Sequence, residues 1–293
     1  MICEEYVTPS TLAQALALLA SNRGEARVVA GGTDLIIQLQ QRDRKSVRCL
    51  VDITRIPSLN QIRAEDSHII VGATVTFTQL ENSDIIRERA SVLAEAAGWV
   101  GSPQIRNVGT LAGNVVNAQP AADGAIALTA LDAEAEIARS AGRQWLPVAS
   151  LYVGPGASKV DPTVELVTAF RFPAHGAREG SAFERLARRK ALALPLINIG
   201  ACVQLDEAGT SFRSVRIAVG PVAPIPFRAV QAEAMLKNRL VSEEAIGEAA
   251  DMAANECKPR SSLLRAGKEY RQELVRVLTR RALSRATLHA KGR

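Results

Sequence analysis

The sequence predicts an α+β protein built from two units. The chain has 293 residues, and at about 150 residues per domain this length suggests two domains. Residues 1–175 mix short strand-like and helix-like segments without a regular βαβ repeat, whereas residues 183–288 place three strand-like runs before three helices. Strands followed by helices are typical of an antiparallel sheet with helices packed on one face.

The first unit begins with a helix and a strand. Thr8 and Pro9 precede an Ala- and Leu-rich run to Leu19, so we expect a helix with Thr8 as its N-cap and Pro9 at its first position. A short β-branched strand is expected at 27–30, and residues 35–39 have helical character after a glycine pair. Further strands are expected at 49–53, 68–71, 135–137 and 163–172, and further helices at 85–99 and 124–131.

A polar, glycine-containing segment at 174–181 separates the two units, and we place the join near residue 178. The segment 221–226 contains three prolines, which cannot donate to a sheet ladder, so the last strand is expected to end before it. Strands are expected at 183–186, 197–205 and 212–219, and helices at 228–239, 242–256 and 267–288.

Composition excludes several classes of protein. Hydrophobic residues make up 47% and charged residues 23% of the chain, which is ordinary for a globular protein. Aromatic residues are only 4%, which argues against an aromatic platform for single-stranded nucleic acid. No apolar run reaches about 18 residues, the length that indicates a transmembrane helix. Residues 1–10 carry no basic region ahead of an apolar stretch, so we expect no signal peptide and a cytoplasmic location.

The cysteines and histidines are too scattered in the sequence to form a local metal site or nucleophile. No CxxC or HExxH pattern is present, so the sequence supports neither an iron–sulfur cluster nor a zinc site in this chain. We expect the cysteines to be buried, reduced thiols, and we assign no metal ligand and no catalytic residue. The side chains concerned are Cys3, Cys49, Cys202, Cys257, His68, His175 and His289.

Positive charge is concentrated at the C-terminal end. The chain has a net charge of +6, and residues 258–293 hold eleven Lys and Arg against Glu269 and Glu273, which is +9 and leaves −3 for the rest. Leu274 and Leu278 recur among these cations at helical spacing, which predicts an amphipathic helix with a basic face. That face could be solvated, could dock on a partner subunit, or could bind nucleic acid.

Two glycine-containing segments carry the strongest functional signal. Val28–Leu35 and Gly109–Asn114 each place small residues where the chain leaves regular structure, and each contains a threonine. Backbone N–H groups in such turns can converge on an anion, and glycine lets the backbone approach a phosphate closely. Two such nests could bind the two halves of a pyrophosphate, although either segment alone could be an ordinary turn.

Other nucleotide-binding motifs do not fit. The first segment is not GxGxxG and the chain has no GxxxxGK[ST], which argues against a Rossmann site and against a P-loop. Gly154-Pro155-Gly156 also resembles a phosphate-binding loop. Because Pro155 lacks a backbone N–H group, we expect a structural turn there.

Five strings along the chain carry a resemblance to one family. They are 30–40 (AGGTDLIIQLQ), 101–123 (GSPQIRNVGTLAGNVVNAQPAAD), 183–194 (FERLARRKALAL), 215–229 (VRIAVGPVAPIPFRA) and 265–283 (RAGKEYRQELVRVLTRRAL). In this order and spacing they resemble the FAD-binding medium subunit of the molybdenum hydroxylases, the family of xanthine dehydrogenase, nicotinate dehydrogenase and aerobic carbon monoxide dehydrogenase. The resemblance covers essentially the whole chain.

The resemblance implies a fold and a set of FAD contacts. Residues 1–178 would form a vanillyl-alcohol-oxidase-type FAD-binding domain of the PCMH type, in two lobes. Residues 179–293 would form the C-terminal domain of carbon monoxide dehydrogenase flavoproteins, with three antiparallel strands and a helix bundle. The two glycine segments would hold the FAD diphosphate from opposite sides, and three later side chains would join them. The implied cofactor-binding positions are Val28, Val29, Ala30, Gly31, Gly32, Thr33, Asp34, Leu35, Gly109, Thr110, Ala112, Gly113, Asn114, Asp123, Leu166 and Arg185.

Some positions depart from the family pattern. Ala112 stands where the family more often has glycine, and we expect it at negative φ, which leaves Gly113 as the essential glycine. Arg185 stands where bacterial relatives often carry lysine, which keeps the charge but not the shape of the side chain. Arg106 is as readily structural as cofactor-binding.

By this resemblance the chain is one part of a larger oxidoreductase. Electrons would originate at a molybdopterin centre on a large subunit, arrive through [2Fe-2S] clusters on a small subunit, and leave the flavin for NAD or another acceptor. The strings favour xanthine dehydrogenase or a related N-heterocycle dehydrogenase over a carbon monoxide enzyme. The alternatives are the flavoprotein subunit of an aerobic carbon monoxide dehydrogenase, a stand-alone flavin oxidase, and a protein that has lost FAD. Neither glycine segment offers a His or Cys for a covalent flavin link.

Overall fold

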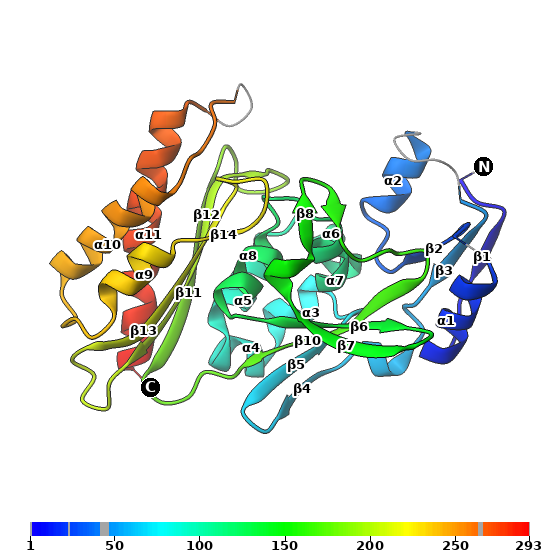
Figure 1. The fold of residues 1–293 in the computed structure, drawn as a ribbon, viewed down its shortest axis with the longest axis horizontal. Helices are drawn as coiled ribbons and strands as arrows, with labels where there is room; N and C mark the ends of the chain where they lie inside the picture. Colours follow the sequence, from blue (N-terminus) through cyan, green and yellow to red (C-terminus); the bar gives the residue numbers. More distant parts are fainter. Residues whose placement is uncertain (1, 23, 42–46, 263–265, 293) are drawn as a thin grey trace.

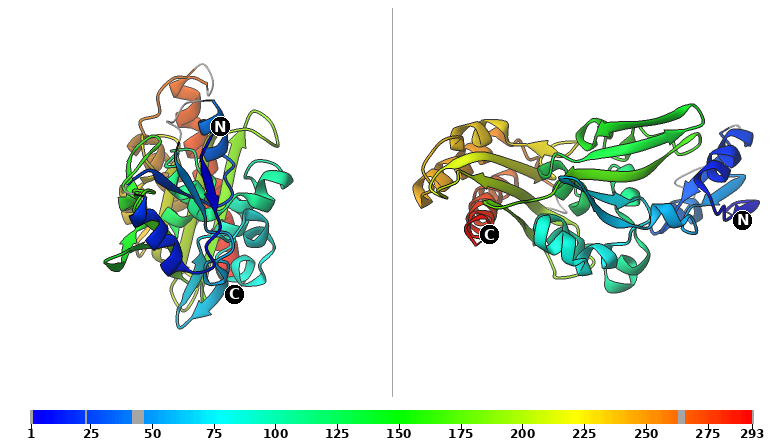
Figure 2. Two further views of the ribbon diagram at one scale, coloured as in Figure 1. Left: turned by 90° about the vertical axis from the view of Figure 1, so that its right-hand side faces the viewer. Right: turned by 90° about the horizontal axis from the view of Figure 1, so that it is seen from below.

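The computed structural model describes residues 2–22, 24–41, 47–262 and 266–292. The molecule is elongated, with the N-terminal strands at one end and the C-terminal helices at the other (Figure 1). The right-hand view of Figure 2 shows the same order of parts, with the five-stranded sheet and its helices between these two ends.

The N-terminal lobe is a three-stranded parallel sheet in the order β1-β3-β2. Its strands are β1 (Glu5–Val7), β2 (Ala26–Val29) and β3 (Cys49–Asp52), and its helices are α1 (Leu12–Ser21) and α2 (Leu35–Gln40). The predicted N-cap of the first helix was wrong. Thr11, not Thr8, caps α1, because the Gln14 side chain three positions later completes a capping box with it.

The central body is built on a five-stranded antiparallel sheet in the order β4-β5-β10-β6-β7. Helices cover one face of this sheet and bury the largest apolar cluster of the described chain between them and the sheet. The strands are β4 (Ile62–Glu65), β5 (His68–Gly72), β6 (Glu134–Arg139), β7 (Gly142–Pro147) and β10 (Glu165–Pro173). The helices are α3 (Phe77–Asn82), α4 (Asp84–Arg89), α5 (Ser91–Gly98), α6 (Pro103–Val108), α7 (Leu111–Val116) and α8 (Asp123–Ala130), with short 3-10 turns at Pro57–Leu59 and Val148–Leu151.

In the body, one expected helix is divided into two and one expected turn is present. The helix expected at 85–99 is two helices, α4 and α5, because Ala90 between them has φ −159° and ψ 49°, outside the helical region. The turn expected at Gly154-Pro155-Gly156 is confirmed as the bend of a small hairpin between β8 (Tyr152–Gly154) and β9 (Ala157–Ser158). Gly156 has φ +71°, a conformation that glycine adopts without strain.

The C-terminal part is an antiparallel sheet in the order β11-β12-β13-β14 with helices on one face. The strands are β11 (Glu179–Ala187), β12 (Pro195–Leu205), β13 (Phe212–Gly220) and β14 (Phe227–Arg228), and the helices are α9 (Val230–Leu236), α10 (Glu243–Glu256) and α11 (Lys268–Lys291). The three expected strands are therefore present, and β13 ends directly before the proline segment. The other face of the sheet packs on α5 and α8 of the body.

Some arginines of the basic C-terminal helix α11 pair with acidic side chains of the same chain. Arg276 pairs with Asp251 and Glu273, and Arg285 pairs with Glu95 and Glu184. The opposite side of α11 packs on the sheet. For these arginines the helix face is internally neutralised and is not an unbalanced cationic surface.

The expectation of buried thiols is confirmed at three of the four cysteines. Cys49, Cys202 and Cys257 are buried free thiols, and Cys3 is half-buried. Within the described ranges, no group of His, Cys, Asp and Glu side chains is arranged to hold a metal ion. In the same ranges, none of the helices combines the length and the apolar character that crossing a membrane requires.

Candidate functional site

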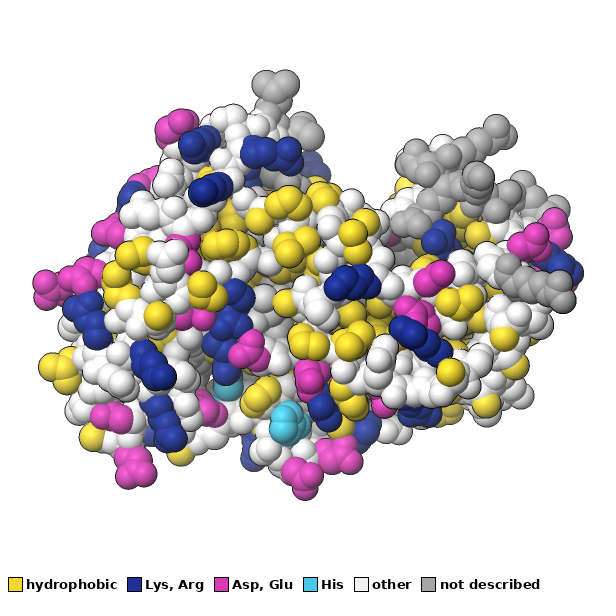
Figure 3. Space-filling model, viewed as in Figure 1, with side chains coloured by type: hydrophobic (Ala, Val, Ile, Leu, Met, Phe, Trp, Pro, Cys, Tyr) yellow, Lys and Arg dark blue, Asp and Glu magenta, His cyan; other side chains and the backbone are white. Residues whose placement is uncertain are grey.

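A cavity of about 600 Å³ lies where the N-terminal lobe, the body and the C-terminal sheet meet. The face drawn in Figure 3 is indented between the N-terminal lobe and the rest of the molecule. The cavity walls come from the four segments 27–38, 100–123, 156–167 and 185–194, together with Ile53 and Phe77. A cavity of this size is within the range of about 300–1,000 Å³ that is usual for small-molecule and cofactor sites.

The two glycine segments meet directly at this cavity. A Cβ atom placed on Gly31 would lie 2.1 Å from the carbonyl oxygen of Val108 and 2.9 Å from the Cα of Gly109. Gly32 adopts φ +67°, a left-handed conformation, and so turns the chain from β2 into α2. From the sequence, we expected glycine here to let the backbone approach a phosphate closely. In the structure, glycine is required at position 31 because the two segments pack against each other and leave no space for a Cβ atom.

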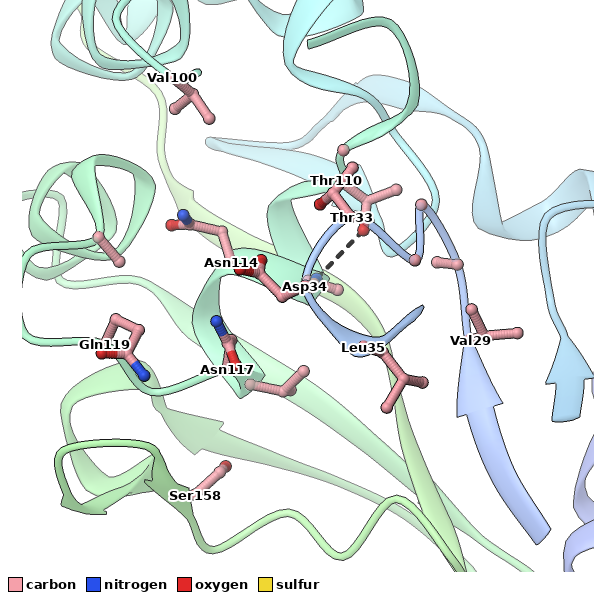
Figure 4. Close-up of a pocket in the computed structure, with 18 of the residues that line it drawn as sticks. Val29, Thr33, Asp34, Leu35, Val100, Thr110, Asn114, Asn117, Gln119 and Ser158 are labelled. Carbon is pink, nitrogen blue, oxygen red and sulfur yellow. Dashed lines mark hydrogen bonds between the residues drawn. The ribbon is translucent and has the colours of Figure 1, made fainter. Parts of the chain in front are cut away.

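The second segment is a capped helix start. Thr110 is the N-cap of α7, and the backbone N–H of Gly113 donates to its Oγ1 over 3.1 Å, the contact marked in Figure 4. Ala112 lies inside α7 and is not among the residues with positive φ, as expected. A Cβ on Gly113 would meet only Thr110 Oγ1, at 3.2 Å, so the remaining space beside Gly113 is open.

Two amide side chains on the cavity wall, those of Asn117 and Gln119, were not predicted from the sequence. In Figure 4 the amides of Asn114, Asn117 and Gln119 lie across the cavity from Leu35 and Val29. Asn117 and Gln119 follow Asn114 in the same string, so extending the second glycine segment by five residues would have found them. Amides both donate and accept hydrogen bonds and therefore suit a ligand that carries hydroxyl and carbonyl groups.

A buried ion pair forms part of the wall at the C-terminal end. The Nε of Arg185, on β11, donates to Oδ1 of Asp123, the first residue of α8, over 3.1 Å. The Nδ2 of Asn198 donates to the same oxygen over 2.7 Å. The Arg185 guanidinium lies 5.4 Å from the ring centroid of Trp99. Burial outweighs these partners and raises the pKa of Asp123 to about 6.

Toward the N-terminal lobe, the cavity wall includes Leu166 and Ile53. Leu166, on β10, is 2% exposed and packs with Ile53 and Ile56 of the N-terminal lobe. The lobe is also tied to the body here, because the backbone N–H of Val28 donates to the carbonyl of Pro162 over 3.1 Å.

The structure gathers all of the predicted cofactor-binding residues around one cavity. Every member of the set Val28–Leu35, Gly109, Thr110, Ala112, Gly113, Asn114, Asp123, Leu166 and Arg185 lines it. Arg106 does not, because its guanidinium donates to Glu81 and to the carbonyl of Val100. Gly156 does line the cavity, so the hairpin turn that the sequence assigned to structure also forms part of the wall.

Comparison with known proteins identifies the family. The family model described as the FAD binding domain in molybdopterin dehydrogenase matches residues 2–175, and the model of the CO dehydrogenase flavoprotein C-terminal domain matches residues 181–286. This chain is an FAD-binding subunit of the molybdopterin dehydrogenase family. The predicted α+β fold, the predicted FAD cofactor and the predicted oxidoreductase class are thereby confirmed.

Individual relatives of this flavoprotein come from different branches. The chain is 34% identical over 290 residues to the xanthine dehydrogenase FAD-binding subunit of Escherichia coli O157:H7, which covers 98% of this chain and 97% of that protein. It is 38% identical over 239 residues to the nicotinate dehydrogenase FAD-subunit of Eubacterium barkeri, with 79% of each covered. Among solved structures, a chain of carbon monoxide dehydrogenase from Hydrogenophaga pseudoflava superposes with a TM-score of 0.89 at 31% identity, with 97% of each chain covered.

The residues around the cavity suit FAD. The cofactor has a diphosphate flanked by a sugar alcohol and two ring systems, and the cavity offers backbone turns at its centre with amides and apolar side chains beside them. Backbone N–H groups at such turns bind phosphates without a cationic side chain. This flavoprotein therefore supplies the binding surface, whereas the redox chemistry belongs to the cofactor.

Proposed function

We propose that this chain is the electron-transfer flavoprotein subunit of a xanthine dehydrogenase or a related N-heterocycle dehydrogenase. The residues of the cavity would hold FAD, and the cofactor would supply the redox chemistry between the partner's electrons and an acceptor such as NAD. A small subunit with [2Fe-2S] clusters and a large subunit with molybdopterin are its proposed partners. The observation that carries the proposal is the cavity that both glycine segments line, because a diphosphate bound there would be within reach of backbone N–H groups from both.

The proposal includes the site residues and the domains. FAD contacts are assigned to the sixteen predicted positions, now extended by Asn117 and Gln119 from the same wall. Residues 1–178 are proposed as the FAD-binding domain and residues 179–293 as the C-terminal domain. Hydroxylation of the substrate is assigned to the molybdopterin subunit, as the family resemblance implies.

Two measurements test this proposal. The chain incubated with FAD and passed through gel filtration is expected to keep the absorbance of oxidised flavin, and to reduce an artificial dye with NADH. The same chain alone is expected not to hydroxylate xanthine. Failure to retain FAD would overturn the flavoprotein site, and xanthine turnover by the chain alone would overturn the assignment of hydroxylation to a partner.

A second candidate is the flavoprotein subunit of an aerobic carbon monoxide dehydrogenase-like enzyme. The structural similarity to the Hydrogenophaga pseudoflava enzyme over nearly the whole chain favours it. The complex purified with its partner subunits separates the two candidates. Oxidation of xanthine or nicotinate, but not of carbon monoxide, is expected, and the reverse selectivity would replace the first candidate by the second.

A further inference from the structure

The ion pair between Arg185 and Asp123 is unusually well buried for a pair of charges. The side chains are 3% and 7% exposed, and burying a charged pair costs more free energy than packing apolar side chains of similar volume in the same place. Packing alone therefore does not account for the pair. Both side chains line the cavity, so a role toward the cavity's occupant is the natural explanation.

The cation of this pair is held in one position. The guanidinium of Arg185 donates to Asp123 and to the carbonyl of Ala193, and it lies beside the ring of Trp99. The carboxylate of Asp123 is fixed in turn by the amide of Asn198. A charge held by such a network does not reorganise when charge changes in its neighbourhood, which is the condition for electrostatic tuning.

The position of Arg185 along the cavity also bears on its role. Of the described residues that line the cavity, the basic ones are Arg185 at the C-terminal end and Arg27 at the opposite end. Near Arg185 the wall continues into Leu192 and Leu194, which are 58% and 66% exposed. This end of the cavity therefore reaches the surface, as an end that exchanges electrons with partners must.

We propose that Arg185 and Asp123 together set the reduction potential of FAD in this cavity. With the electron-accepting ring bound at this end of the cavity, Arg185 would be a fixed cation beside it and Asp123 would balance that charge. The inference rests on the proposed function, because it needs FAD in this cavity. Reduction brings two electrons and one proton to FAD and so adds one net negative charge. A fixed cation stabilises the added negative charge and so raises the reduction potential, whereas a fixed anion destabilises it and lowers the potential.

The test is an anaerobic redox titration of the FAD-loaded full chain with dithionite and reference dyes, at a pH well above the pKa of about 6 of Asp123 so that its carboxyl is ionised. Arg185→Met removes the cation and is expected to lower the potential, whereas Asp123→Asn removes the anion and is expected to raise it. Each change is expected to alter the two-electron equilibrium constant at least tenfold, or about 30 mV. Arg185→Lys and the double variant Asp123→Asn/Arg185→Met keep the net charge and are expected to remain close to the unchanged chain.

The two single variants are expected to shift the reduction potential in opposite directions, which a purely structural role of the pair would not produce. If the pair only stabilised the fold, both single variants would weaken FAD binding and shift the potential in the same direction or not at all, and the proposal would be wrong. Asp123→Asn keeps the shape of the side chain and an oxygen that can accept from Arg185 and Asn198, so it carries the test even if Arg185→Met does not fold. Arg106→Met is the matched control, because Arg106 forms a comparable pair with Glu81 over 3.0 Å outside the cavity. Loss of FAD from the unchanged chain would instead overturn the proposed function.

Discussion

Replacing Gly31 by alanine is the most direct test of how the two glycine segments form the site. A Cβ at this position would lie 2.1 Å from the Val108 oxygen, 2.8 Å from the Val108 carbonyl carbon and 2.9 Å from the Gly109 Cα. All three are backbone atoms, so no change of rotamer relieves the contact. For the Cβ to lie even 3.0 Å from the oxygen, the two segments must separate by about 0.9 Å.

This separation moves the N–H groups of the two segments away from a shared ligand. Hydrogen bonds to a charged group are worth roughly 1.5–3 kcal/mol each. Loss of two of them to the diphosphate weakens FAD binding by about 3–6 kcal/mol, which is roughly 10²- to 10⁴-fold in Kd. Overpacking of the contact is expected to lower the free energy of unfolding by about 1–3 kcal/mol as well.

FAD binding is measured by titrating the chain with FAD and recording the quenching of flavin fluorescence. Stability is measured by urea unfolding of the same samples. Gly247→Ala is the matched control, since Gly247 lies in α10 and a Cβ there meets no atom within 4 Å. The control is expected to bind FAD normally and to gain roughly 0.5–1 kcal/mol in stability. A folded Gly31→Ala chain that binds FAD as tightly as the unchanged chain would refute the reasoning.

Three further predictions concern single side chains. Gly113→Val is expected to abolish FAD retention in gel filtration with little change in thermal unfolding, since a Cβ there meets only the Thr110 hydroxyl and the added bulk enters the cavity; a full flavin complement would contradict this. The pKa of Asp123 is raised to about 6, so the folded chain keeps a proton that the unfolded chain releases near pH 4. Stability is therefore expected to fall by on the order of 3 kcal/mol as the pH rises from about 4 to 6, and Asp123→Asn should lack this loss in urea unfolding; equal pH profiles would count against it. Thr11→Ala should lower the free energy of unfolding by about 1 kcal/mol and Thr8→Ala hardly at all, and the reverse order would restore Thr8 as the cap.

The fold was most predictable where one local signal dominated. The proline segment after Gly220 ends β13 where expected, because proline cannot donate to the ladder. The short helices α6 and α7 were not predicted, since six residues give too few turns for a helical period to show. Thr8 and Thr11 both precede the helical run, and the deciding partner was the Gln14 side chain, which completes the capping box.

The site was predictable in its members but not in their contacts. The glycine segments identified the turns, yet that Gly31 packs on Val108 depends on a fold that brings together residues far apart in sequence. The pairing of Asp123 with Arg185 is of the same kind, because β11 and α8 meet only when the C-terminal sheet covers the body. Sequence patterns report local geometry, and contacts of this range follow from tertiary packing.

The cavity also shows why the two units act as one. Every residue of α8 is buried, and its far side is covered by β12 and β13 of the C-terminal sheet. Asp123 begins that helix, and its carboxylate depends on Arg185 and Asn198 from the same sheet. Without the C-terminal sheet, α8 would expose apolar surface and Asp123 would lose both partners at the cavity wall. The glycine segments lie in the first unit, but the wall that completes their cavity is held in place by the second.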